Sequence, residues 1–235
     1  MFDSAALRAR LGGVRDRIAR AAGRVGRDPA SVRLIAVSKT FSVDHIQAAA
    51  DAGQVDFGEN KVQEAVAKMD AARSLNLTWH LIGHLQSNKA RKAGARFDAI
   101  HSLDDPELLA RLDEAALAAG RRLDLLVQVD LAGEATKHGI KPDALLPIFQ
   151  AGAHGRASRI VGLMALPPAA AEAEGARPYF RSLVAVRDEL ARQGVAPAAL
   201  AELSMGMSHD FEVAVEEGAT MVRVGSAIFG ERRYV

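Results

Sequence analysis

The segment LIAVSKT, residues 34–40, has the apolar composition of a buried strand and runs directly into Lys39. Lysine is rarely buried completely unless it is paired or used chemically. One interpretation is that the Lys39 side chain reaches from the strand end into water. The other is a Schiff-base lysine, whose amine forms an imine with the aldehyde of a substrate or a cofactor. Other parts of the chain must discriminate between the two.

A second group of residues, near the C-terminus, has the composition of a phosphate site. In MVRVGSAIFG, residues 221–230, Gly225 and Ser226 follow an apolar strand and begin a short segment. Their backbone N–H groups can therefore point together toward a phosphate. The preceding strand carries SMGMS, in which Ser204 adds a hydroxyl and Gly206 allows a close backbone approach. The alternative is that these glycines only close tight turns.

Arg223 precedes Gly225 by two residues, so both face the same side of a strand. A guanidinium that points into a barrel needs an acceptor because it keeps its proton. Lys39, Arg223 and the phosphate cradle suggest a flat ligand with an aldehyde, a ring nitrogen and a phosphate. We therefore predict pyridoxal 5′-phosphate (PLP) as the cofactor. An aldolase-type lysine barrel without PLP is less favoured, because it would not need an arginine beside the phosphate.

Composition argues against several other classes of protein. The 235 residues include 30 Lys and Arg and 29 Asp and Glu, so no overall field attracts nucleic acid or an anionic membrane. The absence of cysteine excludes disulfides, a thiol nucleophile and thiolate metal sites. The basic stretch SNKARKAGAR, residues 87–96, lacks interleaved aromatic residues and is typical of a solvated helix face. We expect neither nucleic acid nor a membrane as a partner.

The motif HLIGH, residues 80–84, has a spacing that would suit a metal on a helix. Its core-like composition predicts a strand instead, on which His80 and His84 would lie roughly 13 Å apart and could not share one ion. We therefore predict no metal.

Eight apolar runs alternate with amphipathic segments along the chain. Buried parallel strands have continuous apolar runs, so we predict strands at 32–40, 54–60, 78–83, 98–104, 124–131, 159–166, 202–207 and 221–229. Eight β-α units indicate an α/β protein whose residues 1–235 form a single (β/α)8 TIM barrel. A doubly wound open sheet is the alternative, but its first strand would normally lead into a glycine-rich turn, where this chain has Lys39.

Two segments extend this pattern. Residues 1–26 form an Arg-rich amphipathic helix, which we predict to pack on the barrel and not to act as a transit peptide, since its apolar stripe needs a partner surface. The stripe consists of Leu7, Leu11, Val14, Ile18 and Val25. The same residues include no apolar core of a secretory signal, so we expect a cytoplasmic protein. The connection 166–178 is long, and acts either as a lid or as a tolerated insertion.

Five segments resemble those of the pyridoxal phosphate homeostasis (YggS/PROSC) family, and the last is the most specific. They are AVSKT (36–40), FGENKVQE (57–64), WHLIGHLQSNK (79–89), GLMALPP (162–168) and LSMGMSHDFEVAVEEGATMVRVGSAIFGER (203–232). Departures are small: Val224 and Leu166 replace the more usual isoleucine, and His84 stands at a variable position. The resemblance implies a fold-type III PLP barrel, similar to the N-terminal domain of alanine racemase.

The resemblance also implies a role for each site residue. Lys39 matches the lysine that forms the imine with PLP, Arg223 matches the arginine that faces the pyridine nitrogen, and Asn60 matches a pocket-lining residue. The positions that match phosphate-binding residues are Ser204, Gly206, Gly225 and Ser226.

Family members are regarded as carriers and regulators of cellular PLP without established catalytic turnover. The resemblance therefore implies a non-catalytic protein that serves PLP-dependent apo-enzymes, and we expect a monomer. The alternative is a racemase-like enzyme acting on amino acids. Racemisation needs a proton carrier on each face of the cofactor, and racemases take the second, a tyrosine, from another domain. Here the only tyrosines are Tyr179, on a predicted helix, and Tyr234, on the tail.

Overall fold

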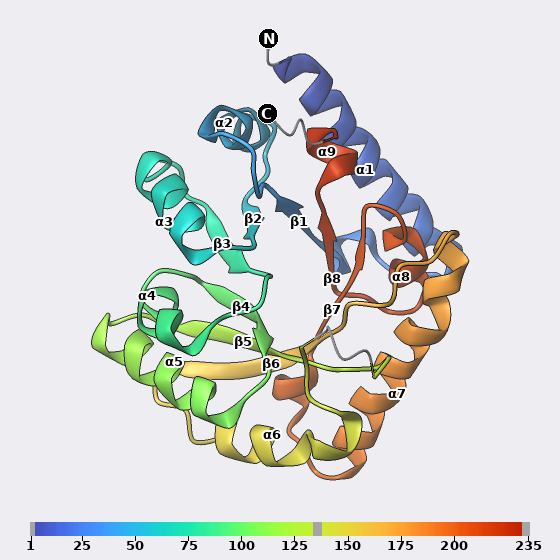
Figure 1. Cartoon of the computed structure of the whole chain (residues 1–235). Coiled ribbons are helices and arrows are strands. Elements are labelled where there is room, and N and C mark those ends of the chain that lie inside the picture. The colour runs from blue at the N-terminus through green and yellow to red at the C-terminus, as the bar shows by residue number, and fades with distance from the viewer. Residues whose placement is uncertain (1–2, 134–137, 232–235) are drawn as a thin grey trace.

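A computed structural model describes residues 3–133 and 138–231, in which parallel strands close into one barrel (Figure 1). The strands are β1 (Arg33–Val37), β2 (Asp56–Glu59), β3 (Thr78–Leu81), β4 (Ala99–Leu103), β5 (Leu123–Gln128), β6 (Ser158–Met164), β7 (Glu202–Met207) and β8 (Met221–Val224). Because β1 pairs with β8 as well as with β2, the sheet has no open edge. The predicted (β/α)8 barrel is confirmed, and the doubly wound alternative is wrong.

Helices surround the barrel and cover the outward side chains of its strands (Figure 1). They are α1 (Ser4–Arg24), α2 (Val43–Asp51), α3 (Val62–Ala71), α4 (Ala90–Gly94), α5 (Pro106–Ala118), α6 (Leu146–Gly152), α7 (Arg177–Arg192), α8 (Phe211–Glu216) and α9 (Ser226–Phe229). Helix α5 illustrates the local signals: the Asp105 carboxylate caps it by accepting from the Glu107 N–H, Pro106 occupies its first turn, and Gly120 follows it with φ +63°. No helix within the described ranges is long and apolar enough to cross a membrane.

Helix α1 packs lengthwise outside β8, against α2, α8 and α9 (Figure 1). The predicted stripe residues from Leu7 to Ile18 are buried. Val25 is wrong as a stripe residue: it follows the helix end and is 45% exposed. Polar contacts flank the apolar seam, among them the ion pair of Arg17 with Glu212 at 2.9 Å.

The predicted strand 221–229 divides at Gly225 into β8 and the short helix α9. The backbone leaves the extended conformation at Gly225, where φ is −115° and ψ is −80°. The turn brings the N–H groups of Gly225 and Ala227 to the same side, where both donate to the Ser208 hydroxyl. The apolar run AIF therefore belongs to a helix that packs against α1.

The interior of the barrel has two different halves. Buried apolar side chains from β1, β5, β6 and β8 form a small cluster separate from the main core, namely Ile35, Leu126, Val161, Met164 and Met221. The buried polar side chains His80, His101, Ser204 and Arg223 come from β3, β4, β7 and β8. This polar half lies beneath the site described below.

Gly162 allows the backbones of β6 and β7 to approach closely. The β5–β6 register shifts here: Leu125 pairs with Ile160 but Leu126 pairs with Gly162, which leaves one extra residue in β6. A Cβ atom on Gly162 would overlap the carbonyl oxygen of Glu202. Backbone atoms of a closed sheet cannot move aside as a flexible side chain can, so a side chain at this position must displace a strand.

We predict that Gly162→Ala lowers the free energy of unfolding by about 1–3 kcal/mol or more, the range of overpacked cores. Gly13→Ala is the matched control, because Gly13 is an exposed position in α1 where a Cβ atom would meet no neighbouring element within 4 Å. The control should raise stability by about 0.5–1 kcal/mol through helix propensity. Urea denaturation followed by circular dichroism measures both, and effects of the same sign would contradict the close-approach argument.

Candidate functional site

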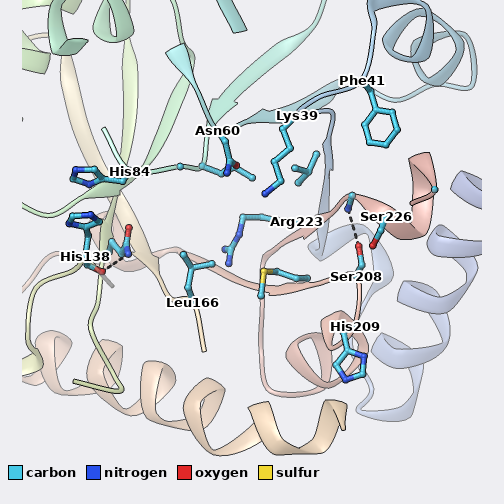
Figure 2. A pocket seen from close by; sticks show the side chains of 17 residues that line it. Lys39, Phe41, Asn60, His84, His138, Leu166, Ser208, His209, Arg223 and Ser226 are labelled. Atoms are coloured by element: carbon cyan, nitrogen blue, oxygen red, sulfur yellow. Dashed lines mark hydrogen bonds between the residues drawn. The ribbon is translucent and has the colours of Figure 1, made fainter. Parts of the chain in front are cut away.

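The carboxyl ends of the strands surround a cavity of about 570 Å³, within the size range of small-molecule sites. Lys39 points into it from the loop after β1, and Arg223 rises beneath it from β8 (Figure 2). Asn60, Gly225 and Ser226 also line it. The structure therefore brings five of the seven predicted site residues to one cavity.

Asn60 is held at the cavity by the neighbouring β3 loop. A Cβ atom on Gly83 would lie 2.5 Å from the carbonyl oxygen of Asn60. Only glycine lets the two loops approach in this way, so WHLIG contributes to the placement of the FGEN motif. Asn60 directly follows β2, where a side chain at a strand end faces the cavity.

The backbone next to Lys39 has an unusual conformation. Thr40 has φ +71°, which makes it the single non-glycine residue with positive φ in the described part of the chain. This conformation is unfavourable for a β-branched residue. The Thr40 N–H donates to Glu64 Oε1 of α3 at 2.6 Å. A contact from a neighbouring helix thus helps to hold the turn that presents Lys39.

A buried lysine connects this turn to β2. Lys68 of α3 donates from Nζ to the Ser38 carbonyl oxygen (2.7 Å), to Glu59 Oε1 (2.8 Å) and to Glu64 Oε1 (2.7 Å). The Ser38 hydroxyl donates to Glu59 Oε1 at 2.6 Å. Lys39 and Asn60 each follow a residue of this network, so Lys68 ties both strand ends together below the cavity.

Glu59 is the vulnerable member of the network. Its side chain is fully buried, and Oε2 has no hydrogen-bond partner among the described residues. Burial raises the pKa of Glu59, while the Lys68 ammonium and the Ser38 hydroxyl act in the opposite direction. The carboxylate therefore depends on Lys68 for its charge.

Two backbone amides converge at the predicted phosphate position, but they belong to Gly225 and Ala227 and not to Gly225 and Ser226, and a hydroxyl that was not among the predicted residues faces them. The N–H groups of Gly225 and Ala227 donate to Ser208 Oγ at 3.0 and 3.4 Å. Ser208 lies just beyond the end of β7, and together with Ser226 it lines one side of the cavity (Figure 2). The cradle thus consists of two convergent amides with two hydroxyls beside them, which suits a small oxyanion.

Ser204 and Gly206 lie elsewhere. Ser204 is fully buried inside the barrel and contacts Arg223 from below, so it does not line the cavity. Gly206 has φ +92°, and a Cβ atom there would lie 2.5 Å from Cβ of Ala214 in α8. Its position favours the turn-closing interpretation, and a phosphate contact by either residue stays a prediction.

Arg223 is 3% exposed and donates to Ser204 Oγ at 2.5 Å and to the Ala165 carbonyl oxygen at 2.9 Å. Burial lowers the pKa of Arg223 to about 10, so the guanidinium remains charged at neutral pH. A guanidinium has five N–H donors and no acceptor. Donors therefore remain for an acceptor in the cavity above.

Below Arg223, a chain of hydrogen bonds crosses the barrel. Ser204 Oγ lies 2.8 Å from Nδ1 of His101, whose Nε2 lies 3.0 Å from Nδ1 of His80. Nε2 of His80 lies 3.0 Å from Asp56 Oδ1, at the amino end of β2. The chain thus joins the floor of the cavity to a partly exposed carboxylate at the opposite end of the barrel.

With both imidazole rings uncharged, the chain has one direction of donation, and the Asp56 carboxylate sets it because a carboxylate can only accept. Nε2 of His80 then carries a proton, each Nδ1 is an acceptor, and Ser204 donates its own proton toward Nδ1 of His101. His101 then donates from Nε2 to Nδ1 of His80, and His80 donates from Nε2 to Asp56. Burial lowers the pKa of His101 well below its usual value, and the nearby positive groups act in the same direction. An uncharged His101 is what this order of donors requires.

Sequence reasoning missed Ser208, Lys68 and His101. Ser208 had a signal, because it is the first hydroxyl residue beyond β7 and strand ends, not strand interiors, face the cavity of a barrel. Lys68 and His101 had none: their partners Ser38 and Ser204 lie 30 and 103 residues away in the chain.

Comparisons with known proteins agree with this geometry. Residues 10–233 match the family model of the alanine racemase N-terminal domain. The pyridoxal phosphate homeostasis protein of Aquifex aeolicus is 42% identical over 225 residues, which cover 96% of this chain and 98% of that protein. The structure of PipY from Synechococcus elongatus with PLP bound is 41% identical, with a TM-score of 0.84 over 95% of this chain and all of that one. An alanine racemase of Clostridium difficile, at 15% identity and a TM-score of 0.71, shares the fold.

We predict that replacing Lys68 makes stability depend on the protonation of Glu59. Without its ammonium partner, the folded-state pKa of Glu59 rises further above the unfolded value, so stability is lost as pH rises from the unfolded pKa toward the folded one. Near pH 4, Lys68→Met and the double variant Lys68→Met/Glu59→Gln should have the same free energy of unfolding. Above pH 4, the free energy of unfolding of Lys68→Met should drop relative to that of the double variant by up to about 1.4 kcal/mol per pH unit. Denaturant unfolding between about pH 4 and 8 tests this, and parallel pH profiles would contradict a charge-dependent role.

We also predict the proton positions in the interior chain. In ¹⁵N spectra of histidine-labelled protein, His80 and His101 should both carry a proton on Nε2 and none on Nδ1. Ser204→Ala removes the donor to His101 and should shift that Nδ1 signal most, while His80 keeps its pattern. Detection of a proton on Nδ1 of His101 would overturn the direction of donation.

Proposed function

The chain belongs to the family of pyridoxal phosphate homeostasis proteins, and from this premise we propose that it binds PLP at Lys39 and acts as a carrier in cytoplasmic PLP homeostasis. The observation that carries the proposal is the convergence of Lys39, Arg223 and the Gly225–Ala227 amides on one cavity. These groups match an aldehyde, a ring nitrogen and a phosphate respectively. The PLP bound in the PipY structure supports the same assignment.

Each part of the cofactor would have its own partner. The Lys39 amine would attack the aldehyde carbon, and loss of water would leave a C=N bond to Nζ. The Gly225 and Ala227 amides, with Ser208 and Ser226, would hold the phosphate. Ser208 already occupies the position of an acceptor at these amides, so a phosphate oxygen would compete with it or bridge to it.

Arg223 would set the electronic character of the ring. PLP supplies an electron sink, which is strongest when the pyridine nitrogen is protonated. A guanidinium donates to this nitrogen and leaves it unprotonated. The hydrogen-bonded side chains from Ser204 to Asp56 orient Arg223, because Ser204 accepts from one side of the guanidinium and leaves the remaining donors for the ring nitrogen. The weaker sink supports retention of PLP over transformation of amino acids.

We extend the proposal to slow or absent turnover. Tyr179 lies in α7 and does not line the cavity, and Tyr234 lies outside the described residues, so no tyrosine of the described chain faces the site. His84, His138 and His209 do line it, so this part of the proposal rests on Arg223 and not on a lack of proton carriers. The recipients we propose are PLP-dependent apo-enzymes, served by a monomer.

We predict that borohydride reduction of the PLP-loaded protein fixes the cofactor on Lys39, because hydride adds to the C=N bond and makes the link permanent. Peptide mapping should find the adduct at Lys39, and Lys39→Ala should abolish both the adduct and the visible imine band. Lys92→Ala, which removes an exposed lysine of α4, is the matched control and should leave both intact. An adduct on another lysine in the unchanged protein would overturn the assignment.

The PLP-loaded protein also allows the carrier function to be distinguished from an enzymatic one. It is incubated with single enantiomers of alanine and serine while chirality and keto-acid formation are followed, and transfer of PLP to an apo-enzyme is measured in parallel. Transfer without sustained turnover is expected. Racemisation or transamination at roughly 1–10³ per second, the ordinary range of enzymes, would favour the racemase alternative.

A further inference from the structure

Three potential metal ligands meet at the rim of the cavity. Two of them, His84 and His138, lie on the side opposite Ser208 and Ser226 (Figure 2). The three are His84 after β3, Asp104 after β4 and His138 in the connection after β5. Each offers one ligand atom, and these atoms all lie within 4.8 Å of one another. Nδ1 of His84 and Oδ2 of Asp104 are 3.5 Å apart. Consecutive strand ends of a barrel are neighbours, which explains why residues far apart in the chain converge here.

The metal site that the sequence argument excluded was a different one, shared by His80 and His84. His80 belongs to the interior chain and uses both ring nitrogens there. His84 lies beyond the end of β3, where the chain has left the strand, and its side chain is 39% exposed. The strand-spacing argument therefore applies to His80 and His84 but not to His84 and His138.

The backbone on both sides of the cluster is anchored. The Gly83 carbonyl oxygen accepts from the Ser102 hydroxyl at 2.8 Å, which ties the His84 loop to β4. The His138 carbonyl oxygen accepts from Nε2 of Gln128 at 2.5 Å, and the Ile140 N–H donates to the Gln128 carbonyl oxygen at 2.8 Å. These contacts place the two histidines side by side without using either imidazole ring.

The rings of His84 and His138 stack, with centroids 3.5 Å apart and planes within 8° of parallel. An imidazole ring nitrogen with a free lone pair is a common metal ligand, so each of the two rings offers one donor atom. A shared ion requires each ring to tilt, because the nitrogen lone pair lies in the ring plane. Both side chains are exposed, so this rotation meets little packing.

Asp104 contributes negative charge at the rim. Its side chain is 14% exposed. A bound cation would stabilise this carboxylate at the rim of the cavity.

We propose that His84, Asp104 and His138 form a site for a divalent transition metal of the Zn²⁺ class, at the rim of the cavity that contains Lys39. Two nitrogen donors and one carboxylate favour such an ion over Mg²⁺ or Ca²⁺, which prefer oxygen ligands. Three protein ligands leave a coordination position for water or for the carboxylate of a small molecule. Because both histidines line the cavity, that position is accessible from it.

Cobalt(II) tests the site directly, since its visible d–d bands report a four- or five-coordinate nitrogen and oxygen environment. The full-length protein is first freed of PLP with hydroxylamine, because PLP itself binds metals, and is then titrated with Co²⁺ and by competition with Zn²⁺. We expect saturable binding of a single ion. His84→Ala and His138→Ala should each weaken it by more than the roughly 10- to 100-fold that loss of an outer-shell partner costs, and Asp104→Asn should weaken it as well.

His154→Ala is the matched control: it removes an exposed histidine that precedes β6, at the other end of the barrel, and should bind Co²⁺ like the unchanged protein. Thermal melting shows that each variant is folded without relying on PLP, which keeps this test independent of the PLP proposal. The absence of saturable binding would overturn the site, and so would an affinity that His84→Ala and His138→Ala leave unchanged.

Discussion

A charged guanidinium inside a β-barrel constrains everything around it. Arg223 is almost fully buried, keeps its proton and can only donate. Its lower partners must therefore be acceptors, and Ser204 fills this position at one end of a chain of hydrogen bonds that continues through His101 and His80 to the carboxylate of Asp56. The polar half of the barrel interior is the result. The donors that remain on Arg223 face the cavity, where a ring nitrogen would complete the set.

A second constraint acts at the end of β1. The turn at Thr40 adopts a conformation that a β-branched residue disfavours, and α3 compensates through Glu64 and Lys68. The Lys68 ammonium also donates to the carbonyl oxygen of Ser38, the residue directly before Lys39. The network thus fixes the backbone that positions Lys39. Its cost is the dependence of the buried Glu59 carboxylate on a single cationic partner, Lys68.

The cavity has two chemically different sides. Amide N–H groups and hydroxyls at Gly225, Ser208 and Ser226 suit an oxyanion, whereas His84, His138 and the nearby Asp104 suit a cation. Lys39 and Arg223 lie between them (Figure 2). A ligand anchored by its phosphate on the first side would extend its reactive end toward the second. This polarity follows from the strands that contribute each side, since β7 and β8 lie across the barrel from β3, β4 and β5 (Figure 1).

The sequence by itself determined the barrel and which of the predicted site residues lie together at one of its ends. Continuous apolar runs separated by amphipathic segments are sufficient for eight buried parallel strands, and residues that directly follow these strands, such as Lys39, Asn60 and Gly225, must then share one face. Only the tertiary structure decided which hydroxyl faces the cradle. Ser204 and Ser208 belong to the same motif, but one lies inside the barrel and the other at its end. The contacts of Lys68 with Ser38, of His101 with Ser204 and of His84 with His138 arise because barrel closure brings distant segments together, and local pattern holds no information about such pairs.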